Sequence, residues 1–140
     1  MLEHYGVPRR YHDGQIIFKQ GTRGDEMYVI RSGKVRVYGM KDGHDVTFAV
    51  LGLHDFFGEM ALLTGEVRSA SASAQGDVEV TVIDHATFNR LVGDPLVHDM
   101  LARMSQRIRD VDAELQKLSS QDDIRREHLS HIIEQRSWFA

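Results

Sequence analysis

The stretch from residue 57 to residue 72 constrains the fold of this 140-residue chain more than any other, and it reads FGEMALLTGEVRSASA. Gly58 lacks a Cβ, so the backbone there can turn tightly and a ligand can approach it closely. A helix-competent run follows over residues 60–63, and the N–H groups of its first turn have no carbonyl partners four residues back. Because such free donors bind anions, the stretch predicts an anion site at the start of a short helix.

Two charged side chains in this stretch suit the two halves of a sugar phosphate. The Glu59 carboxylate only accepts hydrogen bonds, which matches the hydroxyl groups of a sugar. Arg68 follows in the same stretch with a planar fork of donors that matches two phosphate oxygens, and Ser69 adds a hydroxyl. The pattern predicts a site for one nucleotide monophosphate. The alternative is the rim of a β-hairpin in which Glu59 and Arg68 pair with each other.

Small residues and serines alternate after Arg68, with the period-2 pattern of a β-strand. Arg68 shares one face of this pattern with three alanines, which are Ala70, Ala72 and Ala74. If that face lines the interior, Arg68 points inward from the rim, where a buried guanidinium needs an anionic partner. The small alanine side chains leave room for such a partner.

This stretch resembles the phosphate-binding cassette of the cyclic-nucleotide-binding domain family, which catabolite activator-type regulators, kinase regulatory subunits and gated ion channels share. The matching residues are the run Phe-Gly-Glu-Met-Ala-Leu-Leu and the later run Arg-Ser-Ala-Ser-Ala, and the resemblance covers roughly residues 10–118. It implies a β-roll with a lid helix that binds cAMP or cGMP without catalysing a reaction.

The resemblance also implies a role for each cassette residue. Glu59 would bind the ribose 2′-hydroxyl, Arg68 and Ser69 would bind the cyclic phosphate, and backbone groups of the residues around Glu59 would complete the site. The base would lie beside Asp112 in the long helix, at a position where the catabolite activator pattern has a Thr-Ser pair. The candidate ligand-binding residues are Phe57, Gly58, Glu59, Met60, Ala61, Arg68, Ser69, Ala70 and Asp112.

The identity of the ligand depends on Asp112, whose carboxylate can accept from guanine N1 and N2 or from adenine N6. We favour cAMP, and cGMP and cyclic dinucleotides are the alternatives.

Short strands joined by glycine-containing turns are predicted on both sides of the cassette. Ser32-Gly33 has the spacing of a two-residue hairpin loop, and Asp42-Gly43 marks the next hairpin. Residues 1–13 show no strong periodicity and are expected as a lead-in. The expected strands are residues 15–18, 27–31, 34–38, 46–51, 70–74 and 78–83. They predict a mainly β fold, an antiparallel β-roll or jelly roll whose closure removes exposed strand edges.

Two helices are expected after the strands. Asp84 is the predicted N-cap of a short helix over residues 85–92 that Gly93 ends, and Pro95 suits the first turn of a long helix. Apolar residues recur along the long helix with the spacing of a two-stranded coiled coil, at Val97, Leu101, Met104, Ile108, Val111, Leu115 and Leu118. The flanking Ser105 and Arg109 are too polar for a broad apolar face, so we favour a homodimer over a helix that lies on its own roll.

The expected layout is a β-roll with short helices over residues 1–94, a long dimerisation and lid helix over residues 95–120, and a short helical tail over residues 121–140. In transcription factors of the family a winged helix-turn-helix follows the long helix. The segment after Leu118 is too short and too mixed in charge for that module. We therefore expect no direct DNA binding and an output through an unknown downstream protein.

Charge and composition argue against several classes of partner. The net charge of −4 predicts no general attraction to nucleic acids or anionic membranes. The chain has no cysteine, which excludes thiolate metal sites and fits a cytoplasmic protein. No apolar stretch approaches the roughly 18 residues that a membrane span needs.

The eight histidines raise the alternative of a cupin-like metal-binding β-barrel enzyme. Several of them stand singly in turns or at a helix start, as His44, His54 and His85 do, and no metal is expected. No nucleophile stands beside a base, so we expect a ligand that is bound rather than converted. A further alternative is a structural dimer whose pocket has lost its ligand. The intact pair of Glu59 and Arg68 favours a dimeric cyclic-nucleotide sensor over both.

Overall fold

The structure of the protein is a computed structural model that describes residues 2–119, with side chains described for residues 4–111 and 113. The predicted tail over residues 121–140 lies outside the described residues, as do the side chains of Asp112, Leu115 and Leu118. The elements follow in the order η1 (Leu2–Tyr5), β1 (Val7–Tyr11), β2 (Ile16–Phe18), β3 (Glu26–Lys41), β4 (His44–Leu51), β5 (Phe56–Phe57), α1 (Glu59–Thr64), β6 (Ser71–Asp84), α2 (His85–Val92) and α3 (Pro95–Ser119).

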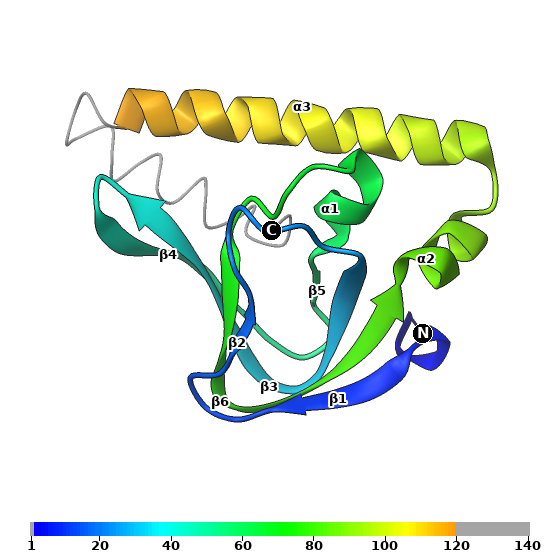
Figure 1. Ribbon diagram of the computed structural model, residues 1–140, viewed down its shortest axis with the longest axis horizontal. Coiled ribbons are helices and arrows are strands. Elements are labelled where there is room, and N and C mark those ends of the chain that lie inside the picture. Colours follow the sequence, from blue (N-terminus) through cyan, green and yellow to red (C-terminus); the bar gives the residue numbers. More distant parts are fainter. Residues whose placement is uncertain (1, 120–140) are drawn as a thin grey trace.

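The strands form one antiparallel sheet that curls into a roll, with long strands β3 and β6 at its centre (Figure 1). Strand β1 pairs with β6 and β4 pairs with β3, while the short strands β2 and β5 add to β6 and β3 respectively. Helix α3 runs along one side of the roll, and α1 packs between α3 and the strands (Figure 1). The predicted fold class, a β-roll followed by a short and a long helix, is confirmed.

The core lies inside the roll, where alternate residues of the two long strands meet. Val35 and Val37 of β3 and Ala72 and Val80 of β6 are buried there. A second apolar cluster forms under the helices from Met27, Val29, Leu62 and Ile83, with Phe88 packed against it. The two clusters fix the positions of the cassette and of α2 against the same sheet.

Local turn and cap signals act where the sequence predicts them. Asp42 and Gly43 both have positive φ, 52° and 78°, and they join β3 to β4 as a two-residue hairpin loop. The Asp84 side chain accepts a hydrogen bond of 2.7 Å from the backbone N–H of Thr87, which caps α2. Gly93, with φ 71°, ends the same helix.

The hairpin predicted at Ser32-Gly33 is wrong. Strand β3 continues through these residues, and both of its halves pair with β6. Gly33 has φ 83°, and the register shifts on both sides of Ser32, so the pair of residues forms a β-bulge. A bulge of the glycine type and a two-residue hairpin loop both use a residue with positive φ, which is why the local sequence does not separate them.

Two further expectations about the strands need correction. The two strands predicted over residues 70–74 and 78–83 are one strand, β6, which passes through Gly76 at φ 76°. The lead-in contains β1, which the sequence did not reveal because its first four residues are exposed. The serine side of the alternating stretch is buried too, since Ser71 accepts from the Gln20 backbone and Ser73 donates to the Tyr38 hydroxyl.

Helix α3 presents both polar and apolar side chains to the roll, and it also exposes apolar side chains to solvent. Ser105 is buried and the Arg109 side chain is only 10% exposed, so these two residues, expected to be too polar for a broad interface, are covered by the rest of the chain. The side chains of Val97, Met100, Met104 and Val111 are exposed. The predicted dimer seam is therefore partly available, although Ile108 is half-buried.

We predict that Gly33→Ala destabilises the protein strongly. A Cβ at Gly33 would collide with the backbone carbonyl oxygen of Asp77, and the positive φ adds a conformational penalty of roughly 1–2 kcal/mol. Gly14→Ala is the matched control, because Gly14 has a similar φ of 80° and open space around it. Urea unfolding should show a larger loss for Gly33→Ala than for Gly14→Ala, and equal losses would contradict the role of the bulge.

Candidate functional site

The guanidinium of Arg68 is buried inside the mouth of the roll. Its side chain points inward as predicted, and the residue is 2% exposed. Nη1 donates a hydrogen bond of 2.6 Å to the Gly58 carbonyl and Nη2 one of 2.7 Å to the Glu26 carbonyl, while Nε has no partner. Burial lowers the pKa of Arg68 below its usual value. The cation is thus fixed by neutral carbonyl groups, and its buried Nε–H is left without a partner.

Two glycines and two aromatic rings shape the space around this cation. A Cβ at Gly24 would collide with the guanidinium, and a Cβ at Gly58 would lie 2.8 Å from Nη1. The Phe18 ring centroid lies 4.2 Å from the Arg68 Cζ and the Tyr28 centroid 6.0 Å, so the ring faces add cation–π attraction. Gly24 was missed by the sequence analysis, because its importance depends on a residue far along the chain.

The Glu59 side chain, at the first position of α1, is also buried and lacks a full set of partners. Gly58 precedes it with φ 84°, a left-handed conformation that glycine adopts without strain. The residue is 7% exposed and its Oε2 accepts no hydrogen bond. Burial raises the pKa of Glu59 to about 8, against the opposing effects of its own backbone N–H and of the charges on Arg68 and Arg109. Burial therefore favours the protonated form of Glu59.

The other cassette residues form the walls of the site. Phe57, Met60, Ala61 and Ala70 are buried. Ser69 is half-buried, and its Oγ has no hydrogen-bond partner. To a ligand, these residues can therefore offer only backbone groups and the Ser69 hydroxyl. The charged groups of the site come from Glu59 and Arg68.

Arg109 on α3 is a residue of this site that the sequence analysis did not identify. Its Nη1 donates to Glu66 Oε2 at 2.7 Å and to the Val67 carbonyl at 3.3 Å, which ties α3 to the cassette. Its Nε and Nη2 are buried without a partner. The alternation of polar and apolar residues along α3 carries no signal that distinguishes Arg109 from the arginines exposed to solvent.

Buried side-chain atoms that lack a partner are concentrated in this region. Among the described residues they are Glu59 Oε2, Arg68 Nε, Ser69 Oγ, and Nε and Nη2 of Arg109. Buried polar groups in folded proteins are nearly always hydrogen-bonded, and exceptions indicate a functional site or a missing ligand. Three of these four residues are predicted ligand contacts, so the structure brings them together as an unsatisfied polar site.

An apolar cavity of about 460 Å³ lies next to this site, between the three helices and the ends of β3 and β6. Glu59 and Ser105 are its polar lining residues, and Arg68 does not line it. Leu101, Met104 and Ile108 of α3 form part of its wall. The cavity thus lies between α3 and the roll and reaches Glu59. It does not extend from Glu59 to Arg68.

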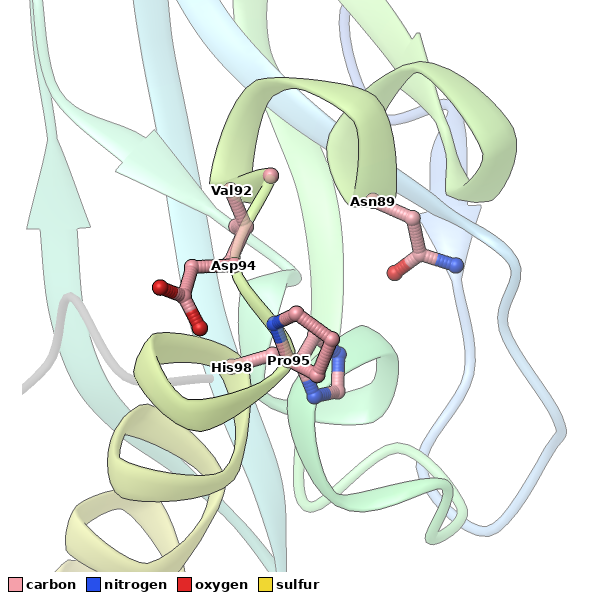
Figure 2. A pocket seen from close by; sticks show the side chains of 6 residues that line it. Asn89, Val92, Asp94, Pro95 and His98 are labelled. Carbon is pink, nitrogen blue, oxygen red and sulfur yellow. The ribbon is translucent and has the colours of Figure 1, made fainter.

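A smaller cavity of about 270 Å³ lies where α2 meets α3 and is lined by Asn89, Asp94 and His98 among others (Figure 2). Figure 2 shows the polar ends of Asn89 and Asp94 turned in different directions. The Asp94 carboxylate accepts from the Leu96 backbone N–H at 2.8 Å, so it serves as a cap for α3. None of the predicted site residues lines this cavity.

Two other expectations were checked against the described part of the chain. There, no three His, Cys, Asp or Glu side chains are grouped as metal ligands, so the cupin-like alternative has no ligand set among these residues. No described helix is long and apolar enough to cross a membrane. The side chain of Asp112, the predicted contact to the base, lies outside the described residues.

Comparison with known proteins identifies the family. The family model for the cyclic nucleotide-binding domain matches residues 8–94, which is more than half of the chain. The chain belongs to the cyclic nucleotide-binding domain family. The match contains the whole cassette, from Phe57 to Ala72.

Relatives of this cyclic nucleotide-binding domain include regulators of different kinds. The cyclic AMP receptor protein of Thermus thermophilus is 39% identical over 84% of this chain and 56% of its own length. A cGMP-dependent protein kinase of Toxoplasma gondii is 35% identical over 76% of this chain and 10% of its own. The crystal structure of the Thermus thermophilus catabolite activator protein superposes with a TM-score of 0.68 at 39% identity, over 84% of this chain and 56% of that one. The chain therefore spans about half or less of these relatives.

We predict that the unliganded protein loses stability, relative to its Glu59→Gln variant, as the pH rises from about 4.5 to about 8. Glu59 has a higher pKa in the folded than in the unfolded state, so in this window the folded state binds more protons and rising pH favours unfolding. Urea unfolding of both proteins at several pH values measures the difference. A difference that does not change with pH would show that Glu59 is not buried as described.

Proposed function

We propose that this cyclic nucleotide-binding domain is a sensor that binds cAMP or cGMP and transmits binding through α3. One observation carries the proposal, the buried Arg68 cation with an unused Nε beside the buried Glu59 with an unused Oε2. Unpaired buried groups of this kind are unfavourable, by about 1–3 kcal/mol each and more for charged groups. A ligand that satisfies both therefore has a site that the folded chain does not fill itself.

The ligand contacts follow from the chemistry of these groups. The cyclic phosphate accepts from Arg68 Nε, from the Ser69 hydroxyl and from backbone N–H groups at the start of α1, around Met60 and Ala61. The ribose 2′-hydroxyl donates to Glu59 Oε2. Phe57, Gly58 and Ala70 bound the space and leave room for the sugar. Among the described side chains of the site no nucleophile stands beside a base, which supports a ligand that is bound and not converted.

In this proposal the base would lie beside Asp112, whose carboxylate can accept from guanine N1 and N2 or from adenine N6. We favour cAMP because the cyclic AMP receptor protein matches 84% of the chain at 39% identity. The match to a cGMP-dependent protein kinase makes cGMP the second ligand to test. Cyclic dinucleotides are a third class of ligand to test.

A second copy of the chain is the proposed partner for the exposed side of α3. The side chains of Val97, Met100, Met104 and Val111 form an apolar stripe that the described part of the roll leaves uncovered. Their spacing of three, four and seven residues is that of a coiled-coil seam. A homodimer through this stripe would connect the α3 helices of two sites, and the signal would pass to a downstream protein in the cytoplasm.

We predict that Arg68→Ala lowers the affinity for cAMP and cGMP by on the order of 2–5 kcal/mol, because the phosphate loses its main buried countercharge. Calorimetry with both nucleotides and with a cyclic dinucleotide measures this. Arg103→Ala is the control, since Arg103 is exposed and, within the described part of the chain, pairs with Asp99. An Arg68→Ala protein that binds as tightly as the wild type would refute the site.

We predict that the double variant Val97→Lys and Val111→Lys is monomeric, because two charges would face two others across the apolar stripe. Sedimentation velocity of the wild type and the variant measures the change in mass. Asp110→Lys is the control, since Asp110 is exposed and α-helical geometry places it about 100° from Val111. A wild type that sediments as a monomer would contradict the dimer.

A further inference from the structure

Polar groups are unevenly distributed in the apolar cavity between α3 and the roll. Its polar lining residues are Glu59 of α1 and Ser105 of α3, and both are buried. Helix α2 contributes apolar side chains, those of Phe88, Leu91 and Val92. The cavity therefore has a polar part at α1 and α3 and an apolar part at α2. A mainly apolar lining with one or two polar groups is typical of sites for small molecules.

The size of the cavity suits a ligand of two rings. A dry apolar cavity of roughly 150 Å³ is large enough to bind benzene. This cavity has a volume of about 460 Å³. The lining residues Leu91 and Leu101 are 39% and 37% exposed, so solvent can reach the cavity between α2 and α3.

Rings and sulfur atoms in the lining favour an aromatic ligand. Phe56 and Phe88 present aromatic rings to the cavity, and Met27 and Met104 contribute thioether groups. Aromatic rings gain from edge and offset contacts with other rings, and sulfur atoms make favourable contacts with ring edges.

The charges around the cavity disfavour an ionised ligand. Glu59 is the ionisable lining residue in the described part of the chain, and the charges on Arg68 and Arg109 act on it. A cation would meet these two positive charges, and either kind of ion would lose its hydration in apolar surroundings. A neutral hydroxyl can instead bond to the Glu59 carboxyl group, whose Oε2 has no partner.

We propose that this cavity is a second ligand site, which binds a neutral aromatic molecule with one hydroxyl group. The hydroxyl bonds to the Glu59 carboxyl group, and the rings pack against Phe88, Leu91 and Val92. Arg68 does not line the cavity, so the site requires no phosphate group on its ligand. The inference does not rest on nucleotide binding, although Glu59 would be common to the two sites.

The first test uses 4-phenylphenol, a neutral two-ring phenol, and the full chain without nucleotide. Calorimetry should give a Kd on the order of 100 μM or tighter, as expected for a ligand of this size. The charged counterparts biphenyl-4-carboxylate and 4-phenylbenzylammonium should bind about tenfold more weakly or worse, because they must be desolvated. Amide chemical shifts should change at Ile83 and in α2 at Phe88 and Val92.

The second test uses two Leu→Trp variants of α3. Leu101→Trp places a larger side chain in the cavity and should weaken 4-phenylphenol binding by about tenfold or more. Leu96→Trp is the matched control, because Leu96 is 66% exposed and does not line the cavity, and its affinity should stay within about twofold of the wild type.

The third test examines the bond to Glu59. Glu59→Leu should reduce the preference for 4-phenylphenol over 4-methylbiphenyl by about threefold to tenfold, which corresponds to one hydrogen bond between neutral groups. An unchanged preference would contradict the contact with Glu59.

Three results would overturn the site itself. One is a wild type that does not bind 4-phenylphenol, and another is equal affinity in Leu101→Trp and Leu96→Trp. The third is a set of shift changes confined to the residues around Arg68, which would place the phenol in the proposed nucleotide site. These shifts are measured on the wild type, so they decide the location even if a variant fails to fold. A wild type that binds the phenol but neither cAMP nor cGMP would refute the proposed function and support this site.

Discussion

Burial of the Arg68 cation is the constraint on which the rest of this site depends. An unpaired charge in a protein interior is strongly unfavourable, and the chain meets this one with two carbonyl groups and the faces of two aromatic rings. The geometry leaves no space for a Cβ at Gly24 or Gly58. Carbonyl oxygens stabilise the charge only partly, because they are dipoles and not anions. An anionic ligand would therefore add the negative charge that the carbonyl groups and rings around Arg68 do not supply.

The buried cation also determines the state of Glu59. A carboxylate that faced Arg68 closely would neutralise it and close the site, but the structure forms no such ion pair. Desolvation instead raises the pKa of Glu59, which favours the neutral acid beside the Arg68 charge. This arrangement sacrifices stability for selectivity, as functional sites commonly do. A ligand hydroxyl that donates to Glu59 would give Oε2 a hydrogen-bond partner, and a ligand phosphate that accepts from Arg68 would neutralise the buried cation.

The features predictable from the sequence are those that local chemistry determines. Glu59, Arg68 and the inward alanine face follow from spacing, and the Asp42-Gly43 loop and the Asp84 cap follow from local hydrogen bonding. The bulge at Gly33 was read as a hairpin because strand continuity depends on β6, which lies far along the chain. Gly24 and Arg109 were missed for the same reason, since each matters only through a partner more than 40 residues away.

Helix α3 packs loosely against the roll and exposes apolar side chains on its other side. Toward the roll it meets a cavity of about 460 Å³ and a partly exposed ion pair, neither of which holds a helix firmly. Toward solvent it offers apolar side chains to another surface. Well-packed cores resist displacement, so the loosely packed interface is the element that a ligand can move at the lowest free-energy cost. Any ligand contact made by α3 directly converts binding energy into a preference for one position of this helix, because an equilibrium shifts only by the difference in affinity between its states.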